Sequence, residues 1–315
     1  MKKTGLFIDI SATVLALALC ACSAPVTEAT TEDTVEETTA VTTEAVVETE
    51  DSAASETSDE TSEESATEES EEADPDERIT KSITTYTKYS GDEDFVMTRC
   101  EEYDENGMLI RLTVCTNTKT PDVVTVTTYT YEFDADGNAV KRIAAVQDSE
   151  SVIEYEYDSK GNVVRETRYT AEGDVQMTYV YEHDALGNLT VEESYNPYGD
   201  LMTRIESEYD EHNNEVRRTV FDSEGEVNSY WVFTYESDSM VEASLYDREG
   251  NIKTWNEFEL DENGFASKQI VHNEDGSVTD ITFERDADGT LLAVEYTVDF
   301  GGSKTFTRTE YEYYD

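Results

Sequence analysis

Glycine recurs along this chain at intervals that alternate between about 12 and 14 residues, and this spacing limits the possible folds more than any other feature. Two intervals make a repeat of 25 or 26 residues, which is typical of a repeat architecture. The series runs through Gly161, Gly173, Gly187, Gly199, Gly225, Gly250, Gly264, Gly276 and Gly289. Asn213 and Ser239 stand where it predicts two further turns.

An acidic residue usually stands three places before the turn glycine, as at Asp158, Asp184 and Asp210. Asp at the first and Gly at the fourth position favour a type I turn. The glycine then takes the positive φ that closes a G1 bulge. Each unit therefore predicts a three-residue hairpin loop between two antiparallel strands.

This loop fixes the strand register, because it pairs the residue four before the glycine with the residue two after it. The first is usually aromatic and the second aliphatic, and such cross-strand pairs contribute roughly 0.2–1 kcal/mol each. The predicted pairs are Tyr157 with Val163, Tyr169 with Val175, Tyr195 with Leu201, Phe221 with Val227, Tyr235 with Val241, and Tyr246 with Ile252.

Alternation along the strands predicts two different sheet faces. Between residues 155 and 209 the odd positions are mostly Tyr, Val, Leu and Ile, whereas the even positions are mostly Glu and Arg. Even spacings preserve this division through successive turns. Two strands break it, since Val241 and Tyr246 are five apart, as are Val278 and Phe283, so we expect a β-bulge in each.

The fold class predicted from these patterns is all-β, an antiparallel meander of about 16–18 strands. A flat sheet would leave its aromatic face in water, so the sheet must curl into an open barrel or a shell-like form. A β-propeller with two repeats per four-stranded blade is the alternative.

The segments YEYDSKGNVV (155–164) and YEHDALGNLT (181–190) resemble the YD repeats of the Rhs family. The resemblance covers roughly residues 100–315 and implies an antiparallel β-ribbon that winds into a hollow shell. The chain is far shorter than the large toxins of that family. The only Asp-Pro is Asp74-Pro75, so their Asp-Pro-x-Gly autocleavage motif is missing. The resemblance supports a fold rather than a toxin function.

Residues 1–22 are typical of a bacterial lipoprotein signal, with Lys2 and Lys3 before an apolar stretch. Leu19-Cys20-Ala21-Cys22 fits a lipobox, which makes Cys22 the expected lipidation site. A register ending at Cys20 and an ordinary secretory signal are the alternatives. We therefore predict an extracytoplasmic bacterial lipoprotein whose acyl chains anchor it to a membrane.

Residues 23–78 form the predicted linker, and residues 79–315 the repeat domain. From 23 to 77 the chain has twenty-one Asp or Glu residues and neither Lys nor Arg. Such a segment buries too little apolar surface to offset its conformational entropy, so we expect a disordered acidic tether.

The net charge of the whole chain is −52. Nucleic acid is an unsuitable partner because phosphate binding requires basic patches. We expect no cofactor, and a glycan, cell-wall or protein ligand. The chain lacks a Gly-x-Ser-x-Gly elbow, a His-Glu-x-x-His motif and a phosphate loop.

Two turns suggest calcium, because Asp134 and Asp136 in one, and Asp286 and Asp288 in another, place carboxylates at alternate positions. The turn itself requires Asp and Gly, and neither loop has a closing Glu, so we expect no metal. His183, His212 and His272 fit repeat positions better than catalytic or metal-binding ones.

Four further residues bear on disulfides and on ligand binding. The Gly107 hairpin would pair Cys100 with Leu112 and Cys115 with Val96, too far apart for a disulfide, so both thiols should be free. Trp231 should point inward. Trp255 falls opposite to Ile252 and Phe258 and is the best single candidate for a ligand contact.

The sequence favours a non-catalytic binding or structural module on the bacterial surface. One alternative is a carbohydrate-active enzyme with an acidic cleft inside the curled sheet, and another is a remnant of an Rhs-type toxin system.

Overall fold

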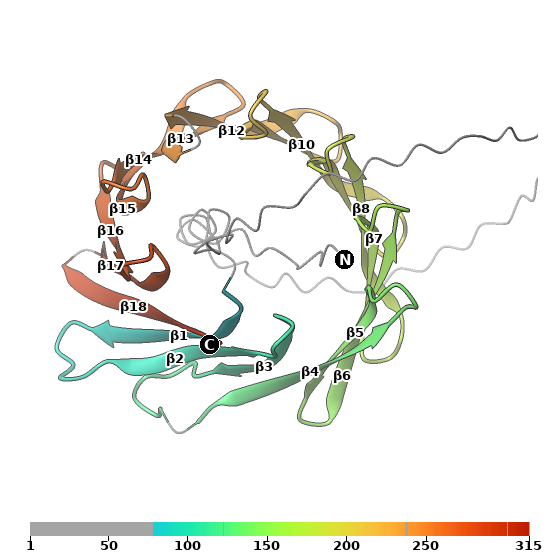
Figure 1. Cartoon of the computed structure of the whole chain (residues 1–315), viewed down its shortest axis with the longest axis horizontal. Helices are drawn as coiled ribbons and strands as arrows, with labels where there is room; N and C mark the ends of the chain where they lie inside the picture. The colour runs from blue at the N-terminus through green and yellow to red at the C-terminus, as the bar shows by residue number, and fades with distance from the viewer. Residues whose placement is uncertain (1–77, 122, 237–238, 301, 315) are drawn as a thin grey trace, which may run out of the picture. The chain divides into compact units, whose positions relative to one another are not determined.

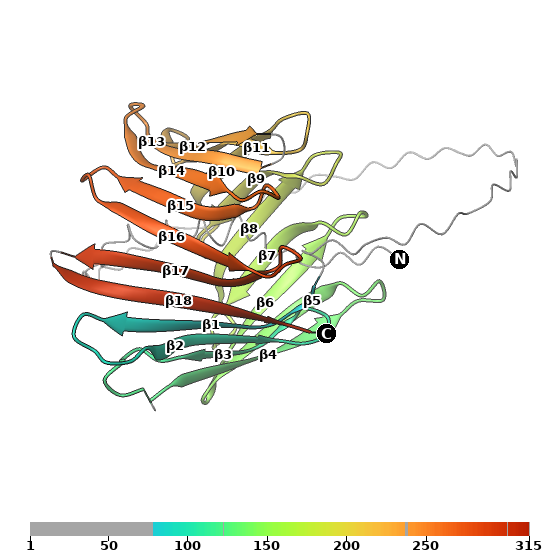
Figure 2. The ribbon, with the colours of Figure 1, turned by 60° about the vertical axis from the view of Figure 1, so that its left-hand side comes forward.

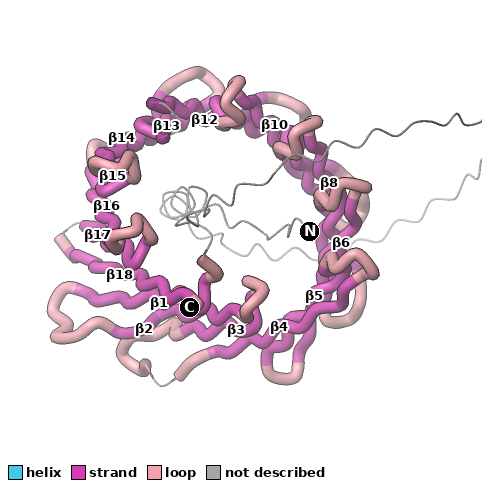
Figure 3. Tube along the Cα trace, viewed as in Figure 1, coloured by secondary structure: helices cyan, strands magenta, loops and turns pink. Residues whose placement is uncertain are grey.

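The computed structural model describes residues 78–121, 123–236, 239–300 and 302–314. The predicted signal, Cys22, and all of the predicted linker except Arg78 lie outside these residues. Every described element is a strand, and turns link the strands at both ends (Figure 3).

There are eighteen strands. They are β1 (Thr80–Tyr89), β2 (Val96–Tyr103), β3 (Leu109–Val114), β4 (Thr125–Phe133), β5 (Ala139–Val146), β6 (Ser149–Tyr157), β7 (Val163–Tyr169), β8 (Val175–His183), β9 (Leu189–Tyr195), β10 (Leu201–Tyr209), β11 (Glu215–Phe221), β12 (Val227–Glu236), β13 (Ser239–Asp247), β14 (Ile252–Leu260), β15 (Ala266–Asn273), β16 (Val278–Arg285), β17 (Leu291–Phe300) and β18 (Ser303–Tyr313).

Each strand pairs with its neighbours in sequence, and β1 also pairs with β18, so the sheet closes into a barrel (Figures 1 and 2). At this seam Thr85 lies opposite Thr309, and their hydroxyl oxygens are 3.1 Å apart. The expectation of an antiparallel meander of 16–18 strands is confirmed. The propeller alternative is wrong, because all the strands belong to one sheet.

The predicted turn chemistry is confirmed. At Gly187, with φ +98°, the backbone N–H donates to the carbonyl of Asp184, and the Asp184 N–H donates to the carbonyl of Asn188. The carboxylate of Asp184 accepts further bonds from backbone N–H groups of the same turn. Asn213 takes the glycine's place with φ 73°. Ser239 does not, because it begins β13 and lies opposite Glu236.

Five of the six predicted cross-strand pairs are confirmed. They are Tyr157 with Val163, Tyr169 with Val175, Tyr195 with Leu201, Phe221 with Val227, and Tyr246 with Ile252. Tyr235 instead lies opposite Met240, because the register shifts past Val241. This shift is the irregularity expected in the 241–246 strand.

One unpredicted feature recurs in almost every hairpin. After the first pair beyond the turn, the outgoing strand skips one residue, so that Glu156 lies opposite Arg165 and Val164 has no counterpart. The skipped residues are Ile110, Val140, Val164, Gln176, Thr190, Met202, Val216, Asn228, Lys253, Ser267 and Leu292. A bulge therefore follows nearly every turn.

These bulges overturn the predicted division into odd and even faces, because one extra residue moves the following side chains to the other face. Tyr155 lies opposite Glu166, whereas Tyr169 lies opposite Val152 on the other side of the sheet. The hairpin between His272 and Val278 has no such shift. The bulge predicted between Val278 and Phe283 is therefore wrong, and these two residues lie on opposite faces.

We call the face that carries Tyr155, Glu166 and Trp231 the inner face, and the face that carries Glu154, Tyr169 and Trp255 the outer face. Most fully buried apolar side chains belong to the inner face, namely Tyr103, Trp231, Phe233, Ala243, Val271, Ile281, Leu291 and Val294. Side chains converge on the concave side of a closed sheet, which explains their burial.

Both described cysteines are free, as expected. The pairing behind that expectation is wrong by one residue, since Cys100 lies opposite Thr113 rather than Leu112. The bulge at Ile110 causes the difference. Cys115 is buried, and its N–H donates to the carbonyl of Thr98, so it does not lie opposite Val96 in the ladder.

Candidate functional site: ligand surfaces on the barrel wall

Two aromatic stacks lie side by side on the outer face of β12–β15. Tyr230 and Tyr246 are opposite each other and stack with ring centroids 5.0 Å apart. Trp255 and His272 are opposite each other and stack at 4.3 Å. Ser244, two residues before Tyr246, lies opposite Trp255, which makes the stacks neighbours.

Apolar side chains extend this surface toward the ends of the strands. Ile252 lies opposite Tyr246 and is 45% exposed, and Val278 lies opposite His272 and is 55% exposed. We call Tyr230, Tyr246, Ile252, Trp255, His272 and Val278 the outer aromatic patch. Adjoining exposed apolar side chains often mark a binding surface.

Charged groups border this patch on two sides. The guanidinium of Arg217 lies 4.1 Å from the ring centroid of Tyr230, within the range of a cation–π interaction. The Nε2 atom of His272 lies 3.2 Å from a carboxylate oxygen of Glu257. The patch therefore offers flat rings for stacking and polar groups at its rim for hydrogen bonding.

The structure thus places Trp255 on the outer face, out of phase with Phe258, as the alternation along the strand predicts. Phe258 lies on the opposite, inner face as predicted, but Ile252 shares the outer face because of the bulge at Lys253. Trp231 points inward as predicted, is 5% exposed, and stacks on Phe233 with centroids 6.2 Å apart.

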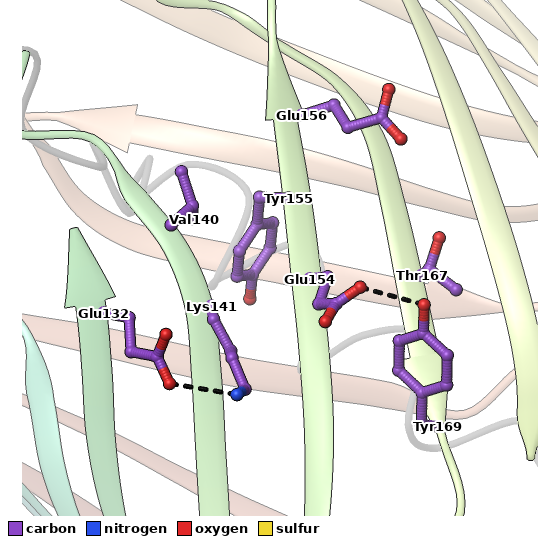
Figure 4. A pocket seen from close by; sticks show the side chains of 8 residues that line it. All are labelled: Glu132, Val140, Lys141, Glu154, Tyr155, Glu156, Thr167 and Tyr169. Carbon is purple, nitrogen blue, oxygen red and sulfur yellow. Dashed lines mark hydrogen bonds and ion pairs between the residues drawn. The ribbon is translucent and has the colours of Figure 1, made fainter. Parts of the chain in front are cut away.

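A hollow of about 360 Å³ opens on the wall formed by β4–β7 (Figure 4). Its lining includes Glu132, Lys141, Glu154, Glu156 and Tyr169. The amino group of Lys141 lies 2.9 Å from Glu132, which raises the pKa of Lys141, and the Tyr169 hydroxyl donates to Glu154 at 2.9 Å. Since these polar groups bond to one another, the hollow is less suited to a ligand than the outer aromatic patch.

A second cluster of charged and aromatic side chains lies on the inner face of β4–β8. Arg168 forms an ion pair with Glu166 at 2.5 Å, and its guanidinium lies 4.4 Å from the ring centroid of Tyr179. The guanidinium of Arg142 lies 5.6 Å from the ring centroid of Tyr129. Tyrosine rings therefore hold two inward-pointing cations in place.

Acidic groups extend this inner surface toward β11. Glu192 lies opposite Tyr181, and burial raises the pKa of Glu192 while the guanidinium of Arg218 opposes that effect. Arg218 in turn forms an ion pair with Glu215 at 2.7 Å. Sequence parity had assigned Glu166, Arg168 and Glu192 to the outer, charged face. The bulges place them inside, and only strand spacing that allowed for a bulge after each turn could have located them.

Three of the four aspartates considered for calcium, Asp134, Asp286 and Asp288, have carboxylates that are engaged by the protein itself. Asp134 accepts bonds from the N–H groups of Asp136 and Asn138. Asp286 and Asp288 both form ion pairs with Arg78, at 3.2 and 3.1 Å. Among the described residues, no group of three or more His, Cys, Asp or Glu side chains is arranged to hold a metal.

The other two histidines belong to the hairpins. His183 lies on the inner face opposite Leu189, and His212 lies in a turn with its Nδ1 atom 3.9 Å from Asp210. No helix in the described part of the chain has the length and apolar character needed to cross a membrane.

No protein-family model matches the sequence, and no curated protein matches it significantly. Solved structures with some likeness include a porin-like protein from Bacteroides uniformis, at 12% identity and a TM-score of 0.43, covering 75% of this chain and 98% of that one. They also include TcdB2-TccC3-TEV, at 11% identity and a TM-score of 0.23, covering 71% of this chain and 14% of that one. A Photorhabdus luminescens Tc holotoxin pore gives 10% identity and a TM-score of 0.23, covering 70% and 17%.

Proposed function

We propose that this protein is an exported bacterial lipoprotein whose barrel is a non-catalytic module that binds a glycan of the cell surface. The observation that carries the proposal is the outer aromatic patch, where Tyr230, Tyr246 and Trp255 lie together on neighbouring strands of one face. Aromatic rings with polar groups at their edges suit sugar rings, which have apolar faces and hydroxyl rims.

The rest of the outer face supports a barrel surrounded by water. Lys141, close to one end of the wall, lies between Glu132 and Glu154. Arg204, nearer the middle of its strand, forms ion pairs with Glu193 and Glu206. A Lys or Arg side chain facing lipid near the middle of a bilayer costs about 2–4 kcal/mol. The barrel is accordingly proposed to stand clear of the membrane, with the acyl chains of Cys22 as its attachment.

Lipid anchoring is tested with a matched pair of cysteine variants. Fatty-acid labelling should be retained in Cys20→Ala and lost in Cys22→Ala, which should also leave the membrane fraction. Loss of label in Cys20→Ala alone would place the lipid on the other cysteine. No label in the wild-type chain would refute the anchor.

Glycan binding is tested by co-sedimentation of the full chain with purified cell-wall polysaccharide. Trp255→Ala should weaken binding about tenfold or more, because a central Trp contact commonly contributes over 1 kcal/mol. Tyr198→Ala is the control, since Tyr198 is 89% exposed in a turn outside the patch. Equal losses in both variants, or no sedimentation of the wild type, would contradict the proposal.

A specific observation supports a carbohydrate-active enzyme as the second candidate. Glu166 and Glu192 share the inner face and interact electrostatically; burial raises the pKa of Glu192, and Glu166 is paired with Arg168. Two carboxyl groups in different environments are the usual acid and base of glycoside hydrolysis. Release of reducing sugar that disappears in Glu192→Gln and persists in Glu193→Gln would favour this candidate over the binding module.

A further inference from the structure

Arg142 differs from most of the other arginines in the hydrogen-bond and ion-pair partners of its guanidinium. Its Nε atom is buried and has no hydrogen-bond partner in the described part of the chain. Arg99, Arg168, Arg204, Arg218 and Arg308 each form an ion pair with a nearby glutamate. Arg285 also has a buried, unpartnered Nε atom, but it donates to the carbonyl of Gly289 at 2.8 Å.

This lack of a partner is unexpected in so acidic a protein. The chain has 74 Asp and Glu residues and only 22 Lys and Arg residues, so carboxylates are abundant. A buried N–H group without an acceptor destabilises the protein, and does so more strongly where the group is charged. A ligand that supplied an acceptor to Arg142 would recover that free energy.

The surroundings of Arg142 are suited to an anion. Arg142 lies in register between Tyr131 on β4 and Ile153 on β6, and Arg168 follows opposite Ile153 on β7. The ring of Tyr129 packs against the Arg142 guanidinium, with 5.6 Å between the ring centroid and the charge. Tyr155 lies two residues beyond Ile153 on the same face. Burial raises the pKa of Tyr155, and the charges of Arg142 and Arg168 act in the opposite direction. The register therefore places both arginines and Tyr155 on one part of the inner face.

The charges near Arg142 do not balance, because the positive charges outnumber the negative ones by one. Arg168 is already paired with Glu166, which leaves the charge of Arg142 uncompensated. The hydroxyl of Tyr131 donates to the carbonyl of Leu109 at 2.8 Å, and is committed to that bond. A planar guanidinium can bind two oxygens of a carboxylate, sulfate or phosphate at once.

We propose that Arg142, Tyr129 and Tyr155 form an oxyanion-binding site on the inner face of the barrel, for the carboxylate, sulfate or phosphate of a small ligand. Arg142 donates to two oxygens of the ligand, the Tyr155 hydroxyl donates to another, and Tyr129 holds the guanidinium flat. This site lies on the opposite face of the sheet from the outer aromatic patch. The anion-binding proposal and the glycan-binding proposal can therefore be tested independently of each other.

The test is an NMR titration of the arginine Nε–H signals in the full chain, with sodium glucuronate, sodium sulfate and sodium phosphate as probes. Sodium chloride at matched ionic strength controls for screening. The Arg142 signal, identified by its loss in Arg142→Lys, should shift saturably and further than any other arginine signal. The probe that saturates at the lowest concentration identifies the preferred anion.

Arg217 provides the matched comparison. It also lies on a tyrosine ring, but on the outer face, and its Nε atom already donates to Thr219 at 3.1 Å. If the Arg142 signal moves no further than that of Arg217, or moves equally with chloride, the shift reflects an adventitious ion only and the site is refuted.

Two variants separate binding from folding. Tyr155→Phe should raise the apparent dissociation constant several-fold while the thermal midpoint stays close to the wild-type value. Arg142→Met should abolish the saturable response, read from the tyrosine fluorescence, whereas Arg111→Met should preserve it, because Arg111 lies on the outer face away from the aromatic patch and is paired with Glu102. An undiminished response in a folded Arg142→Met protein would overturn the proposal.

Discussion

The hydroxyl of Tyr157, just before one turn, donates a 2.8 Å hydrogen bond to the carbonyl oxygen of Ala139, just after the turn two strands earlier. The same link joins Tyr209, which also stands just before a turn aspartate, to Leu189. Tyr131 stands three residues before Asp134, and its hydroxyl makes a comparable bond to the carbonyl of Leu109. Each tyrosine therefore ties its own hairpin to a neighbouring hairpin at the same end of the barrel. This gives a physical reason for the tyrosine that precedes the aspartate in the repeat.

Tyr157→Phe removes this bond and leaves the rest of the ring in place. We expect it to lower the free energy of unfolding by about 1 kcal/mol, a typical net value for one hydrogen bond. For a domain of this size that corresponds to a fall in thermal midpoint of roughly 2–4 °C. Differential scanning calorimetry measures the change.

Tyr169→Phe is the matched control for that experiment. The Tyr169 hydroxyl bonds to the Glu154 carboxylate on the outer face, where water can replace it. Its loss should alter stability by less than half as much. Equal effects of the two substitutions would show that the link to Ala139 has no special role.

The recurring bulge can be tested by cross-linking. With the bulge, Glu154 lies opposite Thr167; without it, the turn would place Glu154 opposite Glu166. Directly opposite residues have Cα atoms within disulfide range. The Glu154→Cys/Thr167→Cys protein should therefore oxidise readily to an intrachain disulfide, identified by peptide mass spectrometry.

The alternative pair, Glu154→Cys/Glu166→Cys, places one thiol on each face and should stay reduced under the same conditions. A disulfide in this second protein, with none in the first, would show that the register contains no bulge at Val164.

Much of the fold follows from residues whose chemistry is local. Asp184 and Gly187 specify a turn because their side-chain oxygen and positive φ act within four residues, so turns, strand number and first pairs were predictable. The bulge at Val164 does not require a particular residue type, so the sequence carries no local signal for it. Tyr169 has an odd number, like Tyr155, and simple alternation therefore assigns both to one face although the bulge separates them. The face of every side chain beyond it was therefore uncertain, including those of Glu166 and Arg168.

The candidate sites divide in the same way. Trp255 was recognisable because it is a large aromatic residue out of phase with its neighbour Phe258. Its stacking on His272 depends on the pairing of β14 with β15, which only the closed register determines. The inner site at Arg142 required both the register and the burial of its Nε atom, and neither can be read from composition.

Gly173 and Gly289 have the same backbone conformation but different surroundings. Comparing substitutions at the two positions therefore separates backbone strain from steric crowding of the new side chain. Gly173 has φ +89° and Gly289 has φ +88°, and both lie where an L-residue costs about 1–2 kcal/mol. A Cβ at Gly173 would meet nothing within 4 Å, whereas at Gly289 it would lie 2.6 Å from the ring of Phe265. Gly289→Ala should therefore destabilise the protein more than Gly173→Ala.

Chemical denaturation of both variants measures this difference, which we expect to be about 1 kcal/mol, because displacing a packed ring costs roughly that much or more. Phe265 also lies under the guanidinium of Arg285, with 5.0 Å between the centroid and the charge, so it cannot move without loss. Indistinguishable unfolding midpoints would show that the ring rotates away freely.

The turn aspartates predict a loss of stability in acid. Hydrogen bonds from Asn138 lower the pKa of Asp134, those from Asn162 lower the pKa of Asp158, and those from Asn188 lower the pKa of Asp184. A folded-state pKa below the unfolded value of about 3.9 contributes stability that is present above pH 4. That contribution disappears as the pH falls through the folded-state values.

The measurement is the thermal midpoint from pH 6 to pH 2, for the wild type and for Asp158→Asn/Asp184→Asn/Asp210→Asn. Asparagine already serves at Asn196, whose side-chain oxygen accepts from the N–H groups of Tyr198 and Asp200, so the triple variant should fold. Relief of repulsion among the other carboxylates acts on both proteins alike. The wild type should therefore lose more stability than the variant below pH 4, and parallel curves would show that these caps do not govern acid stability.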